Sequence, residues 1–302
     1  YKKISFKADL GLISNSFKEK SLSNKYNYNS FVPSINIAVP LTENSNLDIF
    51  YKKSSRNPSL SQLNNHKIYD DNYIIYSGNP KLKPYDVQYS SIKYTYYHKK
   101  ISSGIQLQYS YTLNPLLTDY KQYENYLLRS YNNEDFKQEI VFSTYFSFKL
   151  LKNNLNLTLY GATYKFTNKY NNGNKIKLQS YFYSLSLEYN YNHFIIKGNV
   201  ANPLKKIENQ QKITLPSESD ISIHYKLKHL TMGVGMYLPF AESYKTTTII
   251  NESYIINNYT TQIYDNGRML YLRLSYNFAF DKQLNWNKKL SNEDNDTGVL
   301  KD

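Results

Sequence analysis

Five histidines are the side chains in this sequence that could most readily act as acid–base groups or bind a metal. They are His66, His98, His193, His224 and His229. No two have the spacing of a helical metal pair, and the chain has no cysteine that would complete a zinc site. His224 alternates with Ser222 and Lys226 on one face of an expected strand, and no serine lies in a nucleophile motif. A His224 base paired with a serine is one reading; we favour a polar histidine inside a barrel and expect no enzyme.

Two groups of carboxylates are the other candidates for metal chemistry. They are the pair Asp70 and Asp71, and the cluster Glu293, Asp294 and Asp296. A calcium loop needs oxygen ligands at alternate positions and a glycine at the sharp turn, and neither group has them. We interpret both as solvated charge, and we expect no metal and no cofactor.

Spaced tyrosines mark the most promising ligand-binding segment. The stretch TDYKQYENYLLRSYNNED, residues 118–135, contains Tyr120, Tyr123, Tyr126 and Tyr131. Their rings could stack on a sugar or on the ring of a siderophore, or they could pack one loop against another. Function concentrates on loops held by a rigid scaffold, so we expect any ligand site on the loops 57–84, 114–134 and 239–267. The sequence does not identify the ligand.

The elements that carry these loops have the period of β-strands. In YFYSLSLEYNY, residues 181–191, aromatic and aliphatic residues alternate with serine, glutamate and asparagine. The same alternation recurs along the chain, and no segment of similar length has helical spacing. It predicts about twelve strands, near 3–13, 31–41, 46–56, 85–98, 101–113, 135–150, 153–167, 177–191, 193–201, 217–227, 229–238 and 268–280.

The connections between the expected strands alternate in length. Long links (14–30, 57–84, 114–134, 168–176, 202–216 and 239–267) are separated by short ones (42–46, 98–100, 152–154, 191–193 and 228–229). A soluble sandwich has no reason to keep every second connection short, whereas an up-and-down outer-membrane barrel has short periplasmic turns and long outer loops. The fold class we predict is therefore all-β: a transmembrane antiparallel up-and-down β-barrel over residues 1–280. A polar periplasmic tail follows over 281–302.

Composition agrees with a barrel of this kind. Among 302 residues there are 34 tyrosines and 14 phenylalanines, and no apolar run approaches the roughly eighteen residues of a membrane helix. Aromatic residues gather near the short turns, where a barrel has its interfacial girdle; they are Tyr96, Tyr97, Phe148, Tyr189, Tyr191, Phe278 and Phe280. The lysines behind the net charge of +13 are scattered. They favour contact with membrane lipid and lipopolysaccharide over a nucleic-acid partner.

One strand changes its apolar phase. Between 85 and 98 the apolar residues move from Tyr85 and Tyr89 to Ile92 and Tyr94. Either a β-bulge lies there, or the upper part of the strand rises above the bilayer and turns its tyrosines into the lumen. We favour the second.

Two sequence motifs with restricted backbones flank the longest loop. RNPSLSQL, residues 56–63, leaves one strand, and GNPKLKP, residues 78–84, enters the next. Proline fixes φ and biases the preceding residue to an extended conformation, while glycine permits a sharp turn. We therefore expect structural roles for Arg56, Pro58, Ser59, Leu63, Gly78, Asn79, Pro80, Leu82, Lys83 and Pro84.

In these two motifs the chain resembles the C-terminal half of the barrel of TonB-dependent outer-membrane receptors, in particular the Bacteroidota outer membrane β-barrel family. The last strand, GRMLYLRLSYNFAF at 267–280, is similar to the closing strand of that family. The resemblance implies a 22-stranded barrel in the bacterial outer membrane. It also implies an N-terminal plug, import of a nutrient such as a siderophore, glycan or peptide, and a TonB-type energy-coupling complex. About twelve strands are present and no plug precedes them, so we expect the second half of such a receptor.

Three other readings stay open at this point. A complete twelve-stranded passive channel or surface-binding barrel would close between the strands near 3–13 and 268–280. A soluble β-rich adhesin would bury its apolar stripes between two sheets. An outer-membrane hydrolase would lose activity when His224 is changed.

Overall fold

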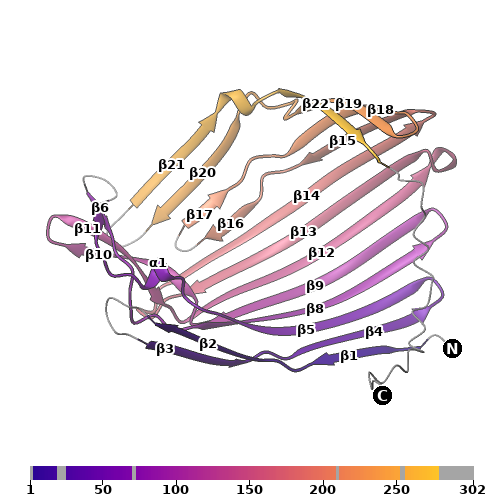
Figure 1. Ribbon diagram of the computed structural model, residues 1–302. Helices are drawn as coiled ribbons and strands as arrows, with labels where there is room; N and C mark the ends of the chain where they lie inside the picture. Colours follow the sequence, from indigo (N-terminus) through magenta and orange to yellow (C-terminus); the bar gives the residue numbers. More distant parts are fainter. Residues whose placement is uncertain (1–2, 19–24, 70–72, 209–210, 252–255, 279–302) are drawn as a thin grey trace, which may run out of the picture.

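A single sheet of twelve antiparallel strands forms most of the computed structural model, which describes residues 3–18, 25–69, 73–208, 211–251 and 256–278. The sheet curls through space, with β1 at one edge and β22 at the other (Figure 1). In spatial order its strands are β1 (Ser5–Asp9), β4 (Ser34–Thr42), β5 (Ser45–Arg56), β8 (Tyr85–His98), β9 (Ile101–Leu113), β12 (Phe136–Leu150), β13 (Leu155–Lys169), β14 (Lys175–Tyr191), β15 (Phe194–Ala201), β18 (Ser219–Lys226), β19 (Leu230–Tyr237) and β22 (Met269–Tyr276). The predicted number of strands and their order are confirmed. The predicted tail, 281–302, lies outside the described residues.

The two faces of this sheet differ in polarity because side chains alternate along each strand. Ile92, Leu107 and Phe142 are neighbours in one cross-strand row, and they are 50%, 47% and 49% exposed. Thr95 and Ser143 point to the opposite face and are buried. Exposed aliphatic and aromatic rows are unfavourable in water and favourable against lipid tails, at about 1.5–3 kcal/mol for each large side chain transferred. The apolar face is therefore the lipid-facing side.

Aromatic pairs line the lipid-facing side near the short turns. The ring centroids of Tyr189 and Tyr191 lie 6.3 Å apart. Those of Phe194 and Tyr225 lie 5.0 Å apart. Such rings favour the membrane interface, where one end is apolar and the other is wet. Tyr97, expected in this girdle, pairs with Ser102 on the inner face, because it follows the outward-facing Tyr96 and successive side chains alternate. Phe280 lies outside the described residues.

A second aromatic cluster lies on the same side near the long loops. Tyr109 stacks on Tyr111 at 6.4 Å, and Tyr111 stacks on Phe136 at 5.7 Å. Tyr111 lies ten positions after Ile101, which is at the short turn. This spacing is roughly 34 Å along the strand and about 24 Å across a bilayer at a tilt near 45°. The two clusters therefore bracket a band of about 25 Å, the height expected for the apolar belt of an outer-membrane barrel.

Strand β8 runs without a bulge. Its pairing with β5 and with β9 shows no register shift from Tyr85 to His98. Tyr85 and Tyr89 therefore share the inner face with Thr95, while Ile92 faces outward. The interpretation that the upper tyrosines turn into the lumen is confirmed.

The short connections are tight, and residues in left-handed backbone close several of them. Lys99 (φ 48°) lies between β8 and β9, and Asn192 (φ 51°) lies between β14 and β15. A one-turn 3₁₀ helix, Leu151–Asn153, joins β12 to β13. Among the described helices, none is long and apolar enough to cross a membrane.

The long links contain strands that the alternation did not reveal. A hairpin of β2 (Leu12–Lys18) and β3 (Lys25–Phe31) follows β1. One four-stranded sheet has the order β10-β11-β7-β6, with β6 (Ile68–Tyr69), β7 (Ile74–Tyr76), β10 (Leu116–Tyr123) and β11 (Tyr126–Asn133). Another has the order β16-β17-β20-β21, with β16 (Lys205–Glu208), β17 (Gln211–Thr214), β20 (Tyr244–Asn251) and β21 (Ile256–Ile263). All of them lie at the same end of the sheet (Figure 1).

The long link expected at 168–176 is wrong. β13 and β14 pair as far as Lys169 and Lys175, which leaves only a tight turn. Gly173 adopts φ +87° in this turn, a conformation that glycine reaches without strain. The strands could therefore continue through residues that read as polar loop.

Candidate ligand-binding site

Gly78 holds the longest loop together at a point where no side chain fits. Its N–H donates to the backbone oxygen of Asn64 at 2.8 Å. A Cβ at this position would lie 2.3 Å from that oxygen and 2.6 Å from the oxygen of Gln62. The glycine of GNPKLKP therefore lets the returning chain lie directly against the segment that left the sheet.

Asn79, the next residue, ties the same loop to its neighbour. Its side-chain amide donates to the backbone oxygen of Tyr131 at 3.0 Å and to Oδ1 of Asn132 at 3.1 Å. Its Oδ1 accepts from the N–H of Lys81 at 2.9 Å. One asparagine thus fixes both a tight turn and the contact with β11.

The contact between segment 78–84 and β11 continues beyond Asn79. The backbone N–H of Lys83 donates to Oδ1 of Asn133, and the side-chain amide of Asn133 donates back to the oxygen of Lys83, at 2.8 and 2.9 Å. Leu82, between Pro80 and Pro84, is only 2% exposed. The segments 56–63 and 78–84 therefore pack with β11 as one unit.

The upstream motif, residues 56–63, contains a short capped helix, α1 (Leu60–Leu63). Ser59 accepts from the N–H of Gln62, and the Gln62 side chain accepts from the N–H of Ser59, which is a capping box. Leu63 is 3% exposed, Pro58 is buried, and Arg56 pairs with Tyr85 in the main sheet.

The four candidate tyrosines lie on one small sheet but on opposite faces. Tyr120 pairs with Arg129 in the β10–β11 hairpin, and Tyr131 lies two residues further along the same face. Tyr123 pairs with Tyr126 on the other face. The set of four therefore does not form one surface.

The face with Tyr131 is packed and not open. The rings of Tyr76 and Tyr131 meet edge to face at 6.2 Å, and the Arg129 guanidinium lies 5.5 Å from the Tyr76 ring centre. The Tyr76 hydroxyl donates to the backbone oxygen of Ser61 at 3.1 Å. Burial, and then the neighbouring Tyr131, raise the pKa of Tyr76 although Arg129 lowers it. Tyr120 is 8% exposed, so this face stabilises the loops.

The opposite face presents an accessible aromatic cluster. The ring of Tyr69, 65% exposed, meets Tyr126 edge to face at 5.6 Å. The Lys67 ammonium lies 3.8 Å from the centre of the Tyr123 ring and donates a hydrogen bond to the Tyr123 hydroxyl. We call Lys67, Tyr69, Tyr123 and Tyr126 the aromatic cluster. It offers ring faces for stacking and one cation for an anionic group.

A buried carboxylate anchors the base of this small sheet. Glu134 is 6% exposed, and its Oε2 accepts from the N–H of Asn171 at 2.8 Å. Burial raises the pKa of Glu134, although the Asn171 hydrogen bond lowers it in part. The contact joins the β10–β11 hairpin to the β13–β14 turn.

The inner face of the main sheet carries charged and polar side chains on β14, β15, β18 and β22. Glu188 and Lys197 form an ion pair at 2.9 Å, and the Tyr271 hydroxyl donates to Asp220 at 2.6 Å. A cavity of about 290 Å³ is lined in part by Glu188, Lys197, Asn199 and Asp220.

His224 lies on this inner face, buried, with Nε2 at 3.1 Å from the Ser222 hydroxyl. Nδ1 lies against Gly233, where a Cβ would be 2.1 Å away. Asp220, the carboxylate of the same strand, bonds to Tyr271 instead. Among the residues that the structure describes, no carboxylate bonds to His224, so the pair has no orienting acid of the kind that a catalytic triad uses.

No metal cluster forms among the residues that the structure describes. Asp70, Asp71 and the cluster Glu293, Asp294 and Asp296 lie outside them.

A curved antiparallel sheet with a lipid-facing apolar belt and a polar inner face defines the wall of a membrane β-barrel. The chain belongs to the outer membrane protein β-barrel family, whose model matches residues 10–278. It is a protein of the bacterial outer membrane. A search of curated protein sequences finds no match.

Three solved structures illustrate the fold. The FrpB iron transporter from Neisseria meningitidis superposes with a TM-score of 0.64 at 13% identity, over 92% of this chain and 44% of that one. The copper transporter OprC gives 0.66 at 11%, over 92% and 45%. The siderophore receptor PirA from Acinetobacter baumannii gives 0.56 at 15%, over 91% and 44%. The chain thus spans less than half the length of these proteins, and its fold is that of part of a TonB-dependent receptor barrel, as the sequence predicted.

Sequence reasoning missed Lys67 and Tyr69. They lie more than fifty residues before Tyr123 and reach it through the β6–β7 hairpin and the parallel pairing of β7 with β11. Short non-local pairing of this kind leaves no periodic signal.

Proposed function

We propose that this chain is the C-terminal half of the barrel of an energised outer-membrane receptor that imports a scarce nutrient such as a siderophore, glycan or peptide. The observation that carries the proposal is the superposition of nearly the whole twelve-stranded sheet on less than half of the FrpB and OprC transporters. Among the described residues, β1 pairs only with β4 and β22 only with β19. A barrel needs further strands between these two edges, because hydrocarbon cannot satisfy free backbone groups.

The long-loop end faces the outside of the cell in this proposal. Outer-membrane barrels keep short turns on the periplasmic side and long loops outside. The aromatic cluster then lies at the mouth where a nutrient arrives. Its three rings and the Lys67 ammonium favour a ligand with flat rings and an anionic group.

The inner wall supports a plugged receptor. Glu188, Lys197, Asp220 and Tyr271 form a polar surface that suits a folded domain inside the lumen better than a lipid. We propose that the N-terminal plug and the missing strands of the same protein occupy that space, and that a TonB-type complex supplies energy through the plug. Membrane lipid and lipopolysaccharide surround the barrel; no enzymatic role and no nucleic-acid partner are proposed.

Uptake by intact cells tests this proposal. Cells that make the full-length protein, and cells that lack it, would be given labelled ferric siderophores, copper complexes, oligosaccharides and peptides, with and without an uncoupler of the proton gradient. We expect accumulation of one class that needs both the protein and the gradient. Uptake that persists with the uncoupler would identify a passive channel instead.

The mass of the native polypeptide is the companion measurement. An antibody against residues 281–302 would detect it in outer-membrane fractions. We expect a band far above 35.6 kDa. A band near that mass would favour a self-closed barrel.

A further inference from the structure

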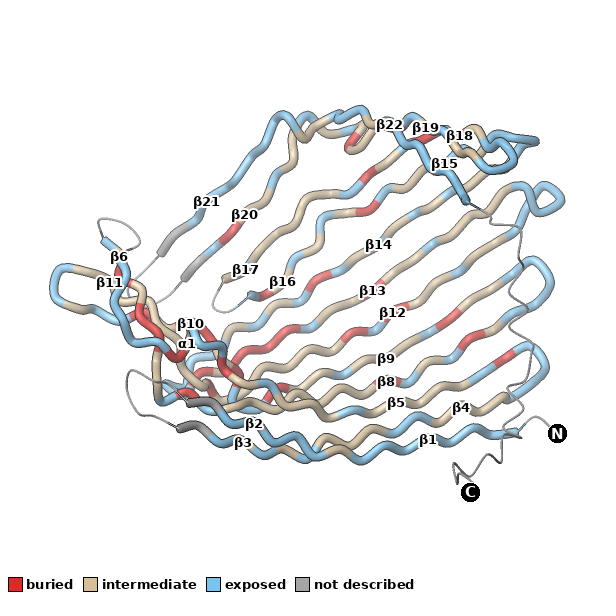
Figure 2. The backbone as a smooth tube through the Cα atoms, viewed as in Figure 1, coloured by how far each residue is buried: buried red, intermediate tan, exposed pale blue. Residues whose placement is uncertain are grey.

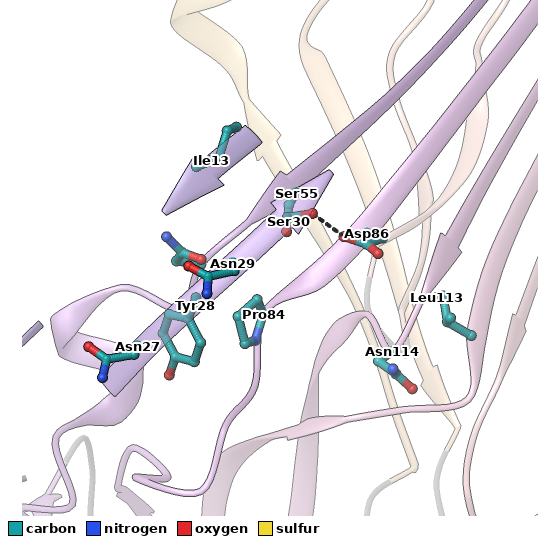
Figure 3. Close-up of a pocket in the computed structure, with 11 residues that line it drawn as sticks. Ile13, Asn27, Tyr28, Asn29, Ser30, Ser55, Pro84, Asp86, Leu113 and Asn114 are labelled. Atoms are coloured by element: carbon teal, nitrogen blue, oxygen red, sulfur yellow. Dashed lines mark hydrogen bonds between the residues drawn. The ribbon is translucent and has the colours of Figure 1, made fainter. Parts of the chain in front are cut away.

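A polar pocket lies on the lipid-facing side of the sheet, away from the aromatic cluster. It has a volume of about 300 Å³ and lies where the β2–β3 hairpin, the ends of β5 and β9, and the start of β8 meet. Figure 3 shows Tyr28, Asn29 and Pro84 toward one end of the pocket and Leu113 and Asn114 toward the other. The volume of the pocket is near the lower end of the roughly 300–1,000 Å³ found for small-molecule sites.

The register fixes which side of the sheet the pocket is on. Asp86 pairs with Ser55 on β5 and with Leu113 on β9. Asp86 and Ile92 are six positions apart along β8, which is an even number, and no register shift intervenes. These three lining residues therefore point to the same side as Ile92 and Leu107, which is the lipid-facing side.

The height of the pocket follows from the aromatic clusters. Leu113 and Asn114 come two and three residues after Tyr111, which marks the upper edge of the apolar belt. The pocket is therefore just above the hydrocarbon, at the level of lipid headgroups. Around it the outward positions of β8 become polar, with Asp86, Gln88 and Ser90 in place of the apolar Ile92 and Tyr94 below.

The lining is rich in groups that both donate and accept hydrogen bonds. Four amides (Asn27, Asn29, Asn57 and Asn114) and two serines (Ser30 and Ser55) line it. Among the residues that the structure describes, the amide side chains of Asn27, Asn29 and Asn57 make no hydrogen bond. Amides and hydroxyls match sugar hydroxyls, which also donate and accept.

The charge of the pocket is balanced. Asp86 is the one charged residue among the described lining residues, and its Oδ2 pairs with the Lys53 ammonium at 2.8 Å. Ser30 donates to its Oδ1 at 3.3 Å. A phosphate or carboxylate ligand would find no uncompensated cation there. The rings of Tyr28 and Pro84 instead offer apolar surface to the C–H face of a sugar, and Tyr28 is held by its hydrogen bond to the oxygen of Leu82 at 3.3 Å.

We propose that this pocket binds a neutral sugar of a glycolipid headgroup in the outer leaflet. The chemistry would equally suit a free oligosaccharide, but the place just above the apolar belt favours a lipid-linked one. The proposal depends on the orientation given above and not on nutrient import.

Binding of defined glycolipids to the full-length protein in detergent tests the proposal. The probes are lipopolysaccharide with a complete core, lipid A without core sugars, and free core oligosaccharide. We expect core-bearing lipopolysaccharide to bind at least tenfold more tightly than lipid A. The double variant Asn29→Ala, Asn57→Ala should remove that difference.

Gln138→Ala is the matched control, because Gln138 pairs with Tyr111 on the same side of the sheet and outside the pocket. Its binding should stay within twofold of the wild type. The single variant Asn29→Ala, at an exposed position, serves if the double variant does not fold, and a several-fold loss is expected.

Each outcome decides between explanations. Equal binding of lipid A and core-bearing lipopolysaccharide, or unchanged binding by the Asn29 variants, would overturn the site. Strong binding of the free oligosaccharide with none of the lipid-linked form would overturn the glycolipid source and keep the sugar chemistry. Failure of nutrient uptake leaves all these results unaffected, so the two proposals fail separately.

Discussion

The side-chain amide of Asn79 donates a hydrogen bond to the backbone oxygen of Tyr131, 3.0 Å away and 52 positions along the chain. This bond joins the loop after β5 to the hairpin after β9, and so it links the two segments that carry the aromatic cluster. The loop after β5 and the hairpin after β9 therefore form one assembly.

Replacing Asn79 with alanine should loosen these two segments without unfolding the barrel. The variant loses three hydrogen bonds, to Tyr131, Asn132 and Lys81, and we expect a cost of about 1–3 kcal/mol in local stability. Limited proteolysis of intact cells should cut segment 57–84 or 114–134 at least several-fold faster. Lys81→Ala, at an exposed site in the same turn, is the control. Equal cleavage of both variants would show that the Asn79 side chain does not hold the loop after β5 against the hairpin after β9.

Gly78 should tolerate no side chain at all. A methyl group there would lie 2.3 Å from the oxygen of Asn64, so Gly78→Ala must push the α1 segment away. Hydrogen exchange should show lost protection at Gly78 and Asn79, whose N–H groups now bond to Asn64 and Gln62. Gly173→Ala probes the positive φ of an open turn and should leave this loop protected. Normal protection in Gly78→Ala would mean that the loop can shift at little cost.

The main sheet was predictable because its signal is local. The alternation that places Ile92 and Leu107 outward is a property of each strand alone, and it survives in spite of the phase change above Ile92. Tyr97 shows the limit: adjacent aromatics such as Tyr96 and Tyr97 must face opposite ways, and composition near a turn does not say which one faces lipid.

The candidate site was predictable only in part. Tyr123 and Tyr126 were found by their spacing, but Tyr120 and Tyr131 belong to a packed face because a hairpin register separates them. Tyr69 and Lys67 come from a distant segment through the parallel pairing of β7 with β11. The pocket beside Asp86 also needs the β2–β3 hairpin, which the sequence read as a polar link.

Glu134 should make the stability of the long-loop end depend on pH. Burial raises its pKa in the folded protein above the ordinary 4.5, so folding favours the protonated acid. This stabilising contribution is complete below the ordinary value and is lost as pH rises through the raised folded value. Glu134→Gln does not ionise and keeps an acceptor for Asn171. It should therefore melt higher than the wild type at pH 7.5, by on the order of 2 °C, with a smaller difference at pH 4. A difference that stays constant between the two pH values would contradict the raised pKa.

The aromatic cluster and the packed face should respond differently to loss of a ring. Tyr126→Ala removes the partner of Tyr69 on the accessible face, whereas Tyr131→Ala removes the partner of Tyr76 on the packed face. If the cluster binds the nutrient, Tyr126→Ala should weaken binding about tenfold, which corresponds to roughly 1.4 kcal/mol. It should leave protease resistance unchanged. Tyr131→Ala should mainly lower protease resistance, because it removes a packing contact. The measurement is the affinity of the full-length protein for the nutrient that the uptake assay identifies, beside proteolysis of the same samples. Full affinity in Tyr126→Ala together with normal protease resistance would move the ligand site away from this sheet.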